Sequence, residues 1–123
     1  MKWIATWSRR VAFWLFWPAL AVVIWGELTP HPPHLEMETS DKFLHFLAYF
    51  GLSGIAAAAL RRRRMIVLAV LGLIALGGML EIVQSFTGRD AEWLDEAANT
   101  LGAVMGAFAG LLFMRLVGQT APD

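Results

Sequence analysis

The side chains that can move protons or bind charged groups fall into three short segments of an otherwise apolar chain. In the first, Asp41, His45 and Tyr49 recur every four residues, and Lys42 precedes the histidine by three. Residues three and four apart share one face of a helix. A histidine beside a carboxylate can act as a general acid or base, and a lysine can bind an anion such as phosphate. This segment therefore predicts a helix face with acid–base and anion-binding groups.

The second and third segments repeat this pattern further along the chain. Glu81 and Gln84 are three residues apart, and Arg89 follows shortly after them. Asp95 and Asn99 are four residues apart and share a face. A carboxylate that is partly removed from water suits acid–base chemistry, and an arginine can hold an anionic group. The three segments together contain the groups that proton transfer next to an anionic substrate would need.

The composition shows in which environment these segments must lie. Of the 123 residues, 58% are hydrophobic and 16% are charged, whereas soluble domains have about 45–50% and about 25%. A soluble fold of this length could not bury so much apolar surface, and a disordered chain would need more charge. The net charge of zero gives no indication of nucleic acid binding, and the lack of cysteine excludes a disulfide framework or a thiolate nucleophile. The remaining class is a small membrane protein.

Hydrophobic spans supply the elements that position the polar segments. A bilayer core requires roughly 20 mostly apolar residues per helix. We predict an all-α polytopic membrane protein, a single domain over residues 1–123 with four transmembrane helices in a bundle. We interpret the first span as an uncleaved anchor, because no small-residue cleavage site follows it. The spans are expected at about 11–26, 43–60, 65–86 and 95–117.

The basic residues predict the orientation. After four crossings, all of them except Lys42 and Arg89 fall on the side of the two termini, including the run from Arg61 to Arg64. Cytoplasmic loops carry the excess of Lys and Arg, so both termini are expected in the cytoplasm and the acidic loops outside the plasma (inner) membrane. We interpret the arginine run as a loop that fixes topology near anionic lipid, in preference to a nucleic-acid patch.

This orientation brings the three polar segments to one depth, at the outer leaflet. Glu81 would lie about one turn below the surface, where it must be paired, protonated or face an aqueous cavity. Gly102, Gly106 and Gly110 would let the fourth helix approach a neighbour closely. Alone, Asp95 could simply complement a helix dipole. Polar residues on three helices at one depth favour a single outward-facing pocket.

Two further histidines give no comparable signal. His31 and His34 flank two prolines in the first outer loop, and no third ligand lies nearby. Structural and catalytic zinc sites use at least three protein ligands. We therefore predict no metal site and no cofactor. The expected partners are membrane lipids and an envelope substrate, with no nucleic acid.

Three sequence blocks, in order, resemble the VanZ-like family of small bacterial membrane proteins. They are DKFLHFLAYF from Asp41, EIVQ with the following Gly88-Arg89, and DEAANTLGAVMG from Asp95. The similarity covers about residues 40–117. The family is named for a member linked to low-level teicoplanin resistance, and its resemblance implies a multi-span protein whose motif residues meet near the outer face. The resemblance does not imply a particular chemical reaction.

These observations lead to one predicted function and two alternatives. The prediction is a protein that acts on or modifies a lipid or glycan component of the cell envelope. A non-catalytic accessory protein that alters the envelope surface is the first alternative. A small proton-coupled transporter is the second, disfavoured because the inner halves of the spans have few polar residues. The predicted catalytic residues are His45, Glu81 and Asp95, and the predicted substrate-binding residues are Asp41, Lys42, Tyr49, Gln84, Arg89 and Asn99.

Overall fold

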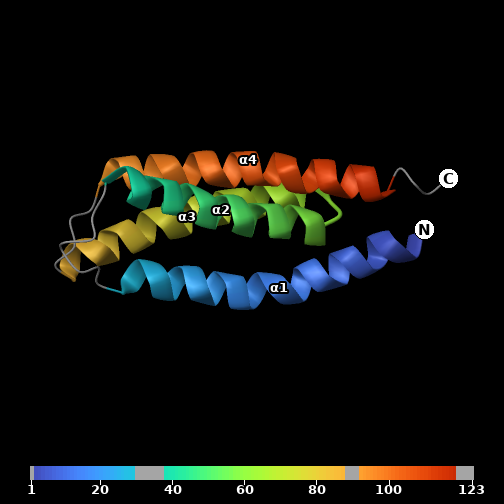
Figure 1. Cartoon of the computed structure of the whole chain (residues 1–123), viewed down its shortest axis with the longest axis horizontal. Helices are drawn as coiled ribbons and strands as arrows, with labels where there is room; N and C mark the ends of the chain where they lie inside the picture. The colour runs from blue at the N-terminus through green and yellow to red at the C-terminus, as the bar shows by residue number, and fades with distance from the viewer. Residues whose placement is uncertain (1, 30–37, 88–91, 119–123) are drawn as a thin grey trace.

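The chain forms a bundle of four helices, each long and apolar enough to cross a membrane (Figure 1). The computed structural model describes residues 2–29, 38–87 and 92–118, and within these ranges there are helices and no strands. The predicted all-α fold with four membrane-spanning helices is therefore confirmed. The helices are α1 (Lys2–Leu28), α2 (Glu38–Ala59), α3 (Arg63–Phe86) and α4 (Trp93–Gly118).

The helices extend beyond the spans expected from hydrophobicity. α1 begins at Lys2 instead of near residue 11, and α2 begins at Glu38 instead of near residue 43. The added turns contain polar residues that a search for apolar runs leaves out. Near a bilayer, backbone groups still favour hydrogen bonds within a helix. The helices therefore continue past the apolar runs from which the membrane spans were predicted.

The two ends of the bundle differ in charge. At one end α1 and α3 finish and α2 and α4 begin, and we call this the acidic end (Figure 1). At the other end α1 begins, α4 finishes, and the exposed arginines 61–64 lie at and just before the start of α3. There Arg9 Nη1 donates to the carbonyl oxygens of Ala58 at 3.2 Å and Leu60 at 2.6 Å. This arginine joins α1 to the carboxyl end of α2.

Glycines determine the most extensive helix contact, between α2 and α4. A Cβ atom on any of three glycines of α4 would overlap a main-chain carbonyl oxygen of α2, so no other residue fits without displacement. Small residues at such positions allow transmembrane helices to approach closely. The close approach predicted from the glycine stripe is confirmed. The contacts pair Gly102 with Phe46, Gly106 with Phe50, and Gly110 with Gly54.

The core between the helices contains mainly small side chains, while large apolar ones point outward. Ala57 and Ala103 are fully enclosed, together with Leu52. Trp14, Phe86 and other large apolar residues lie on the outer surface, where lipid tails would meet them. In α1 only Ala12 and Glu27 are buried. α1 is therefore the most peripheral helix of the bundle.

Candidate functional site

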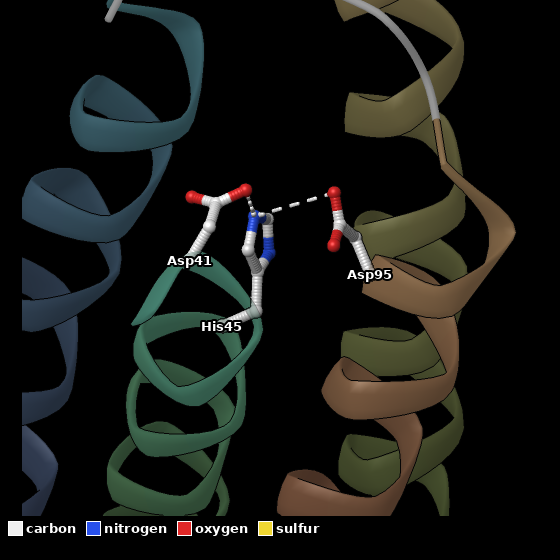
Figure 2. Close-up of side chains that lie close together, drawn as sticks. All are labelled: Asp41, His45 and Asp95. Carbon is white, nitrogen blue, oxygen red and sulfur yellow. Dashed lines mark ion pairs between the residues drawn. The ribbon is translucent and has the colours of Figure 1, made fainter. Parts of the chain in front are cut away.

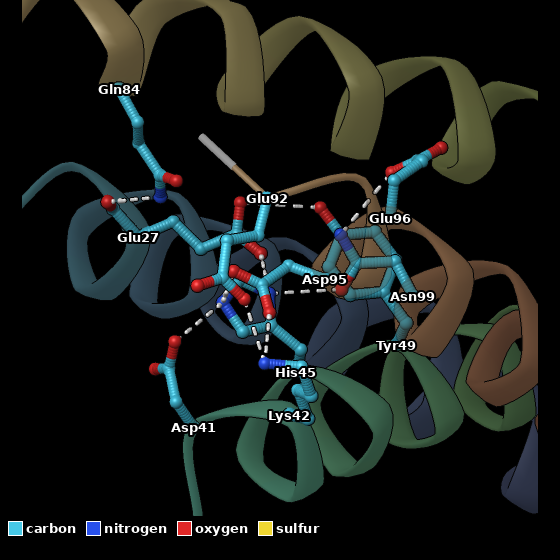
Figure 3. Close-up of polar contacts among 10 residues, drawn as sticks. All are labelled: Glu27, Asp41, Lys42, His45, Tyr49, Gln84, Glu92, Asp95, Glu96 and Asn99. Carbon is cyan, nitrogen blue, oxygen red and sulfur yellow. Dashed lines mark hydrogen bonds and ion pairs between the residues drawn. The ribbon is translucent and has the colours of Figure 1, made fainter. Parts of the chain in front are cut away.

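Polar side chains from all four helices meet at the acidic end of the bundle (Figure 3). Most are buried, which is unusual for ionisable groups in a membrane-spanning bundle and marks functional positions. We call this set the polar cluster. It consists of Glu27 from α1; Asp41, Lys42, His45 and Tyr49 from α2; Glu81 and Gln84 from α3; Glu92, which precedes α4; and Asp95, Glu96 and Asn99 from α4.

The imidazole of His45 lies at the centre of the polar cluster and is 5% exposed. Its Nδ1 atom is 3.0 Å from Asn99 Oδ1 and 3.5 Å from Glu27 Oε1. Its Nε2 atom lies 3.9 Å from Asp41 Oδ2 and 4.0 Å from Asp95 Oδ2 (Figure 2). Both of these distances exceed hydrogen-bond length. The ring is therefore held by hydrogen bonding on one side and faces two carboxylates on the other.

The hydrogen-bond network around Asn99 determines which ring nitrogen of His45 carries the proton. Asn99 Nδ2 donates to Glu96 Oε2 at 3.3 Å, because an ionised carboxylate can only accept. The amide oxygen of Asn99 must then face His45, and an amide oxygen also only accepts. Nδ1 of His45 is therefore the donor, and in the neutral ring the lone pair lies on Nε2. This lone pair faces the gap between Asp41 and Asp95.

The lysine of the polar cluster forms ion pairs with carboxylates. Lys42 Nζ lies 2.7 Å from Glu92 Oε2 and 3.8 Å from Asp95 Oδ1. Arg89, the other cation predicted to hold an anionic group, lies outside the described residues. Among the described residues the cluster thus combines six carboxylates with one lysine and one histidine. Its acidic excess is much larger than the sequence segments suggested.

Glu27 belongs to the polar cluster, although it was not among the predicted site residues. It is 8% exposed and accepts a hydrogen bond from the Tyr49 hydroxyl at 3.4 Å. Gln84 Nε2 donates to the main-chain oxygen of Glu27 at 2.6 Å. Tyr49 and Gln84, predicted to bind substrate, thus position the last turn of α1. A sequence signal existed, because a carboxylate in the last turn of a helix opposes the helix dipole.

Glu81 lies deep at the acidic end, on α3. It is 6% exposed, and within the described part of the chain its carboxylate meets the backbone of Glu92 but no side-chain hydrogen-bond donor. It interacts electrostatically with Asp95, His45 and Glu27. A buried carboxylate with so few hydrogen-bond donors is costly, which singles out this group. The three residues predicted to be catalytic therefore belong to one cluster and do not face separate lipid surfaces.

Gly77 makes room for the hydrogen bonds that orient His45. A Cβ atom at this position of α3 would come within 2.6 Å of Glu96 Oε2 and 2.9 Å of Asn99 Nδ2. Any larger residue would push the carboxylate away from the amide. Gly77 and Glu96 were not predicted as site residues, and in the sequence Gly77 resembles an ordinary packing glycine.

A pocket between α1 and α2 reaches the polar cluster. It encloses about 270 Å³ and has a polar and an apolar part. The polar part, formed by Glu27, Asp41 and His45, gives access to the imidazole. The apolar part extends along the two helices and is formed by Val22, Val23, Leu44 and Ala48.

One group of residues in the described ranges could hold a metal ion. Asp41, His45 and Asp95 each offer a ligand atom, and these atoms all lie within 4.8 Å of one another. The His31 and His34 pair, from which we predicted no metal site, lies outside the described residues.

Comparison of the chain with protein-family models, with curated proteins and with solved structures found no match.

Proposed function

We propose that the chain is a VanZ-like protein of the bacterial plasma membrane that modifies a lipid-linked or glycan component of the cell envelope. In this proposal both termini lie in the cytoplasm, and the acidic end faces outward. His45, Glu81 and Asp95 carry out the proton transfers. Asp41, Lys42 and Asn99 orient the reacting groups, while Tyr49 and Gln84 complete the pocket wall through Glu27.

The placement of the Nε2 atom of His45 is the observation that carries the proposal. A general base needs an accessible lone pair and a fixed ring orientation. The Asn99–Glu96 network supports both, because it holds the proton on Nδ1 and leaves Nε2 toward Asp41 and Asp95. Glu81 is a second acid–base group in the same buried cluster.

The shape of the pocket supports a substrate with an apolar portion. Val22, Val23 and Leu44 form a wall along which a lipid tail can lie, while Glu27 and His45 meet its polar end. Ligand sites generally combine an apolar lining with a few polar groups that set orientation. A lipid-linked envelope component has this combination, with the tail in the bilayer and the polar group at the surface.

The same pocket also supports a second candidate, a binding protein that alters the envelope surface without chemistry. Its lining is mostly apolar, which suits retention of a lipid whatever the reactivity of His45. In that case His45→Gln, which keeps a polar side chain, would leave the envelope phenotype intact. Lys42→Met, which removes the charge that compensates Glu92, would abolish the phenotype.

Comparative profiling of envelope lipids and cell-wall fragments by mass spectrometry tests the proposal. Cells would express the wild type, His45→Ala, Glu81→Gln or Ser85→Ala at matched levels in the membrane. We expect a mass change with the wild type that disappears with His45→Ala and Glu81→Gln. Ser85 is the matched control, because it lies on the same helix but is exposed and bonds to its own helix at Ile82.

Two outcomes would count against the catalytic role. Identical products from the wild type and Glu81→Gln would remove Glu81 from the chemistry. A phenotype that survives His45→Gln but not Lys42→Met would favour the binding candidate.

A further inference from the structure

Three atoms that commonly bind metal ions converge in the polar cluster. They are Nε2 of His45 and one carboxylate oxygen each of Asp41 and Asp95, and Figure 2 shows both carboxylates directed at the ring. The Nε2–oxygen distances are 3.9 and 4.0 Å. Ligand atoms around a four-coordinate ion with bonds of about 2.1 Å lie about 3.4 Å apart. Each Nε2–oxygen distance would have to shorten by about 0.5 Å, and the distance between the two carboxylate oxygens, which is within 4.8 Å, by at most about 1.4 Å.

The hydrogen bonds around these atoms match those of a metal site. A histidine that binds a metal usually donates its other ring N–H to an oxygen acceptor, which fixes its tautomer. His45 Nδ1 does so to Asn99 Oδ1, so Nε2 presents its lone pair. Asp95 is oriented in a similar way, since its Oδ1 lies 3.8 Å from Lys42 Nζ while Oδ2 faces the ring.

The charge of the polar cluster gives a second, independent reason to expect a cation. Glu81 is 94% buried, and no described side chain donates a hydrogen bond to its oxygens, although it interacts with the backbone of Glu92 and with Asp95 and His45. Asp95 Oδ1 has no hydrogen bond in the described chain. Buried carboxylates are tolerated when they are paired or coordinate metals. Lys42 lies against Glu92 and Asp95, and among the described residues His45 is the positive group that interacts with Glu81.

We propose that His45, Asp41 and Asp95 bind a divalent first-row transition-metal ion of the Zn²⁺ class. A nitrogen ligand beside two carboxylates suits such ions, whereas Mg²⁺ and Ca²⁺ prefer oxygen-only sites. Three protein ligands leave a fourth position open, as in catalytic zinc sites. The pocket between α1 and α2 is lined by Asp41 and His45 and so leads to that position.

This inference rests on the proposed function and refines its substrate class. An acidic cluster repels a phosphate group, so it cannot by itself hold the anionic head of a lipid-linked envelope component. A bound cation would reduce the negative charge at the pocket and could coordinate a phosphate oxygen directly. With Nε2 of His45 as a metal ligand, Glu81 would replace His45 as the group that accepts the proton.

Metal binding can be measured without any substrate. The full-length protein would be placed in lipid nanodiscs, stripped with EDTA, dialysed and titrated with ZnSO₄ alone. We expect one Zn²⁺ per chain by elemental analysis, and an X-ray absorption edge that fits one imidazole nitrogen with oxygen ligands. The titration should lose this site in His45→Ala and in Asp95→Asn. Asn99→Ala, which removes only the acceptor at Nδ1, should weaken binding about 10–100-fold.

Two control variants separate this site from other ligands. The chain has three histidines, so the double variant His31→Ala/His34→Ala should bind Zn²⁺ as the wild type does. Glu92→Gln removes a carboxylate from the same cluster outside the ligand trio, and it should also keep the site. A variant that fails to bind Zn²⁺ is evidence for the site only if it keeps the helical content of the wild type and has the same elution volume in size-exclusion chromatography.

The inference is overturned if the wild type takes up no Zn²⁺, or if His45→Ala binds it as tightly as the wild type. Its failure is distinguishable from failure of the proposed function. An envelope mass change that persists in cells whose protein binds no metal would leave proton transfer by His45 in place. Stoichiometric Zn²⁺ without any envelope change would support the metal site and contradict the modification.

Discussion

The helix pair α2–α4 and the helix α1 are attached to the bundle in different ways. α4 contacts the backbone of α2 at Gly102, Gly106 and Gly110, with no side chain in between. α1 is mostly exposed and contributes two buried residues. Its polar contacts lie near its two ends, through Arg9 at one end and Glu27 at the other.

This difference shows how the polar cluster is built. Asp41, His45, Asp95 and Asn99 belong to the closely packed pair, so their spacing is fixed by backbone contact. Glu27 completes the cluster from a helix that is mostly exposed. The pocket lies between α1 and α2. The arrangement places the histidine on the closely packed pair and one wall of the pocket on the more exposed helix.

Replacing a contact glycine should have the largest effect. Gly106→Ala would place a methyl group into the Phe50 carbonyl, and overpacking of this kind costs about 1–3 kcal/mol or more. Gly51→Ala on α2 is the control, since nothing lies within 4 Å of its added Cβ, and the gain in helix propensity is about 0.5–1 kcal/mol. Thermal unfolding in detergent would compare them. Equal stability of the two variants would contradict backbone contact between α2 and α4.

Detaching α1 at the arginine-rich end should have a smaller and more local effect. Arg9→Met removes the donor to Ala58 and Leu60, and the expected loss is on the order of 1.5 kcal/mol. That corresponds to roughly tenfold faster hydrogen exchange in the first turns of α1, with α4 unchanged. Arg10→Met is the matched control, because Arg10 is exposed and carries the same charge. Faster exchange in α4 would show that α1 supports the whole bundle.

A single hydrogen bond between α2 and α4 should matter least. Ser53 Oγ donates to the main-chain oxygen of Ala103 in the buried contact. Bonds of this type contribute about 0.6 kcal/mol on average in membranes, so Ser53→Ala should lower the free energy of unfolding by about that amount. Ser85→Ala should leave it unchanged. A loss of several kcal/mol for Ser53→Ala would mean that polar bonds, and not the glycine contacts, hold the pair.

The sequence predicted the fold well, because the fold depends on long apolar runs and on a glycine stripe. Both patterns can be read within a single helix. A long apolar run indicates a membrane span, and a glycine stripe indicates close packing against another helix. The helices α1 and α2 begin before the spans expected at about 11–26 and 43–60, at Lys2 and Glu38. Backbone hydrogen bonding continues a helix past its apolar part, so the hydrophobicity of the sequence locates the membrane span but not the ends of the helix.

The candidate site could be predicted only in part. The spacing of Asp41, His45 and Tyr49 identified one helix face, and the structure places that face in the polar cluster. Glu27 was not predicted, because a single acid at the end of a span resembles a loop residue. The pairing of Lys42 with Glu92 depends on how α2 and α4 are rotated against each other. No pattern within one helix contains that information.

The glycine contacts also constrain how the chain can change over generations. What each glycine touches is a carbonyl oxygen of α2, and every residue type carries the same carbonyl. No second substitution on α2 can therefore restore the fit after a glycine is lost. Only a shift of the whole of α4 could do so, and that shift would move Asp95 and Asn99 away from His45. In laboratory evolution of this chain we expect substitutions to accumulate on the lipid-facing side of α4. We expect none at Gly102, Gly106 and Gly110.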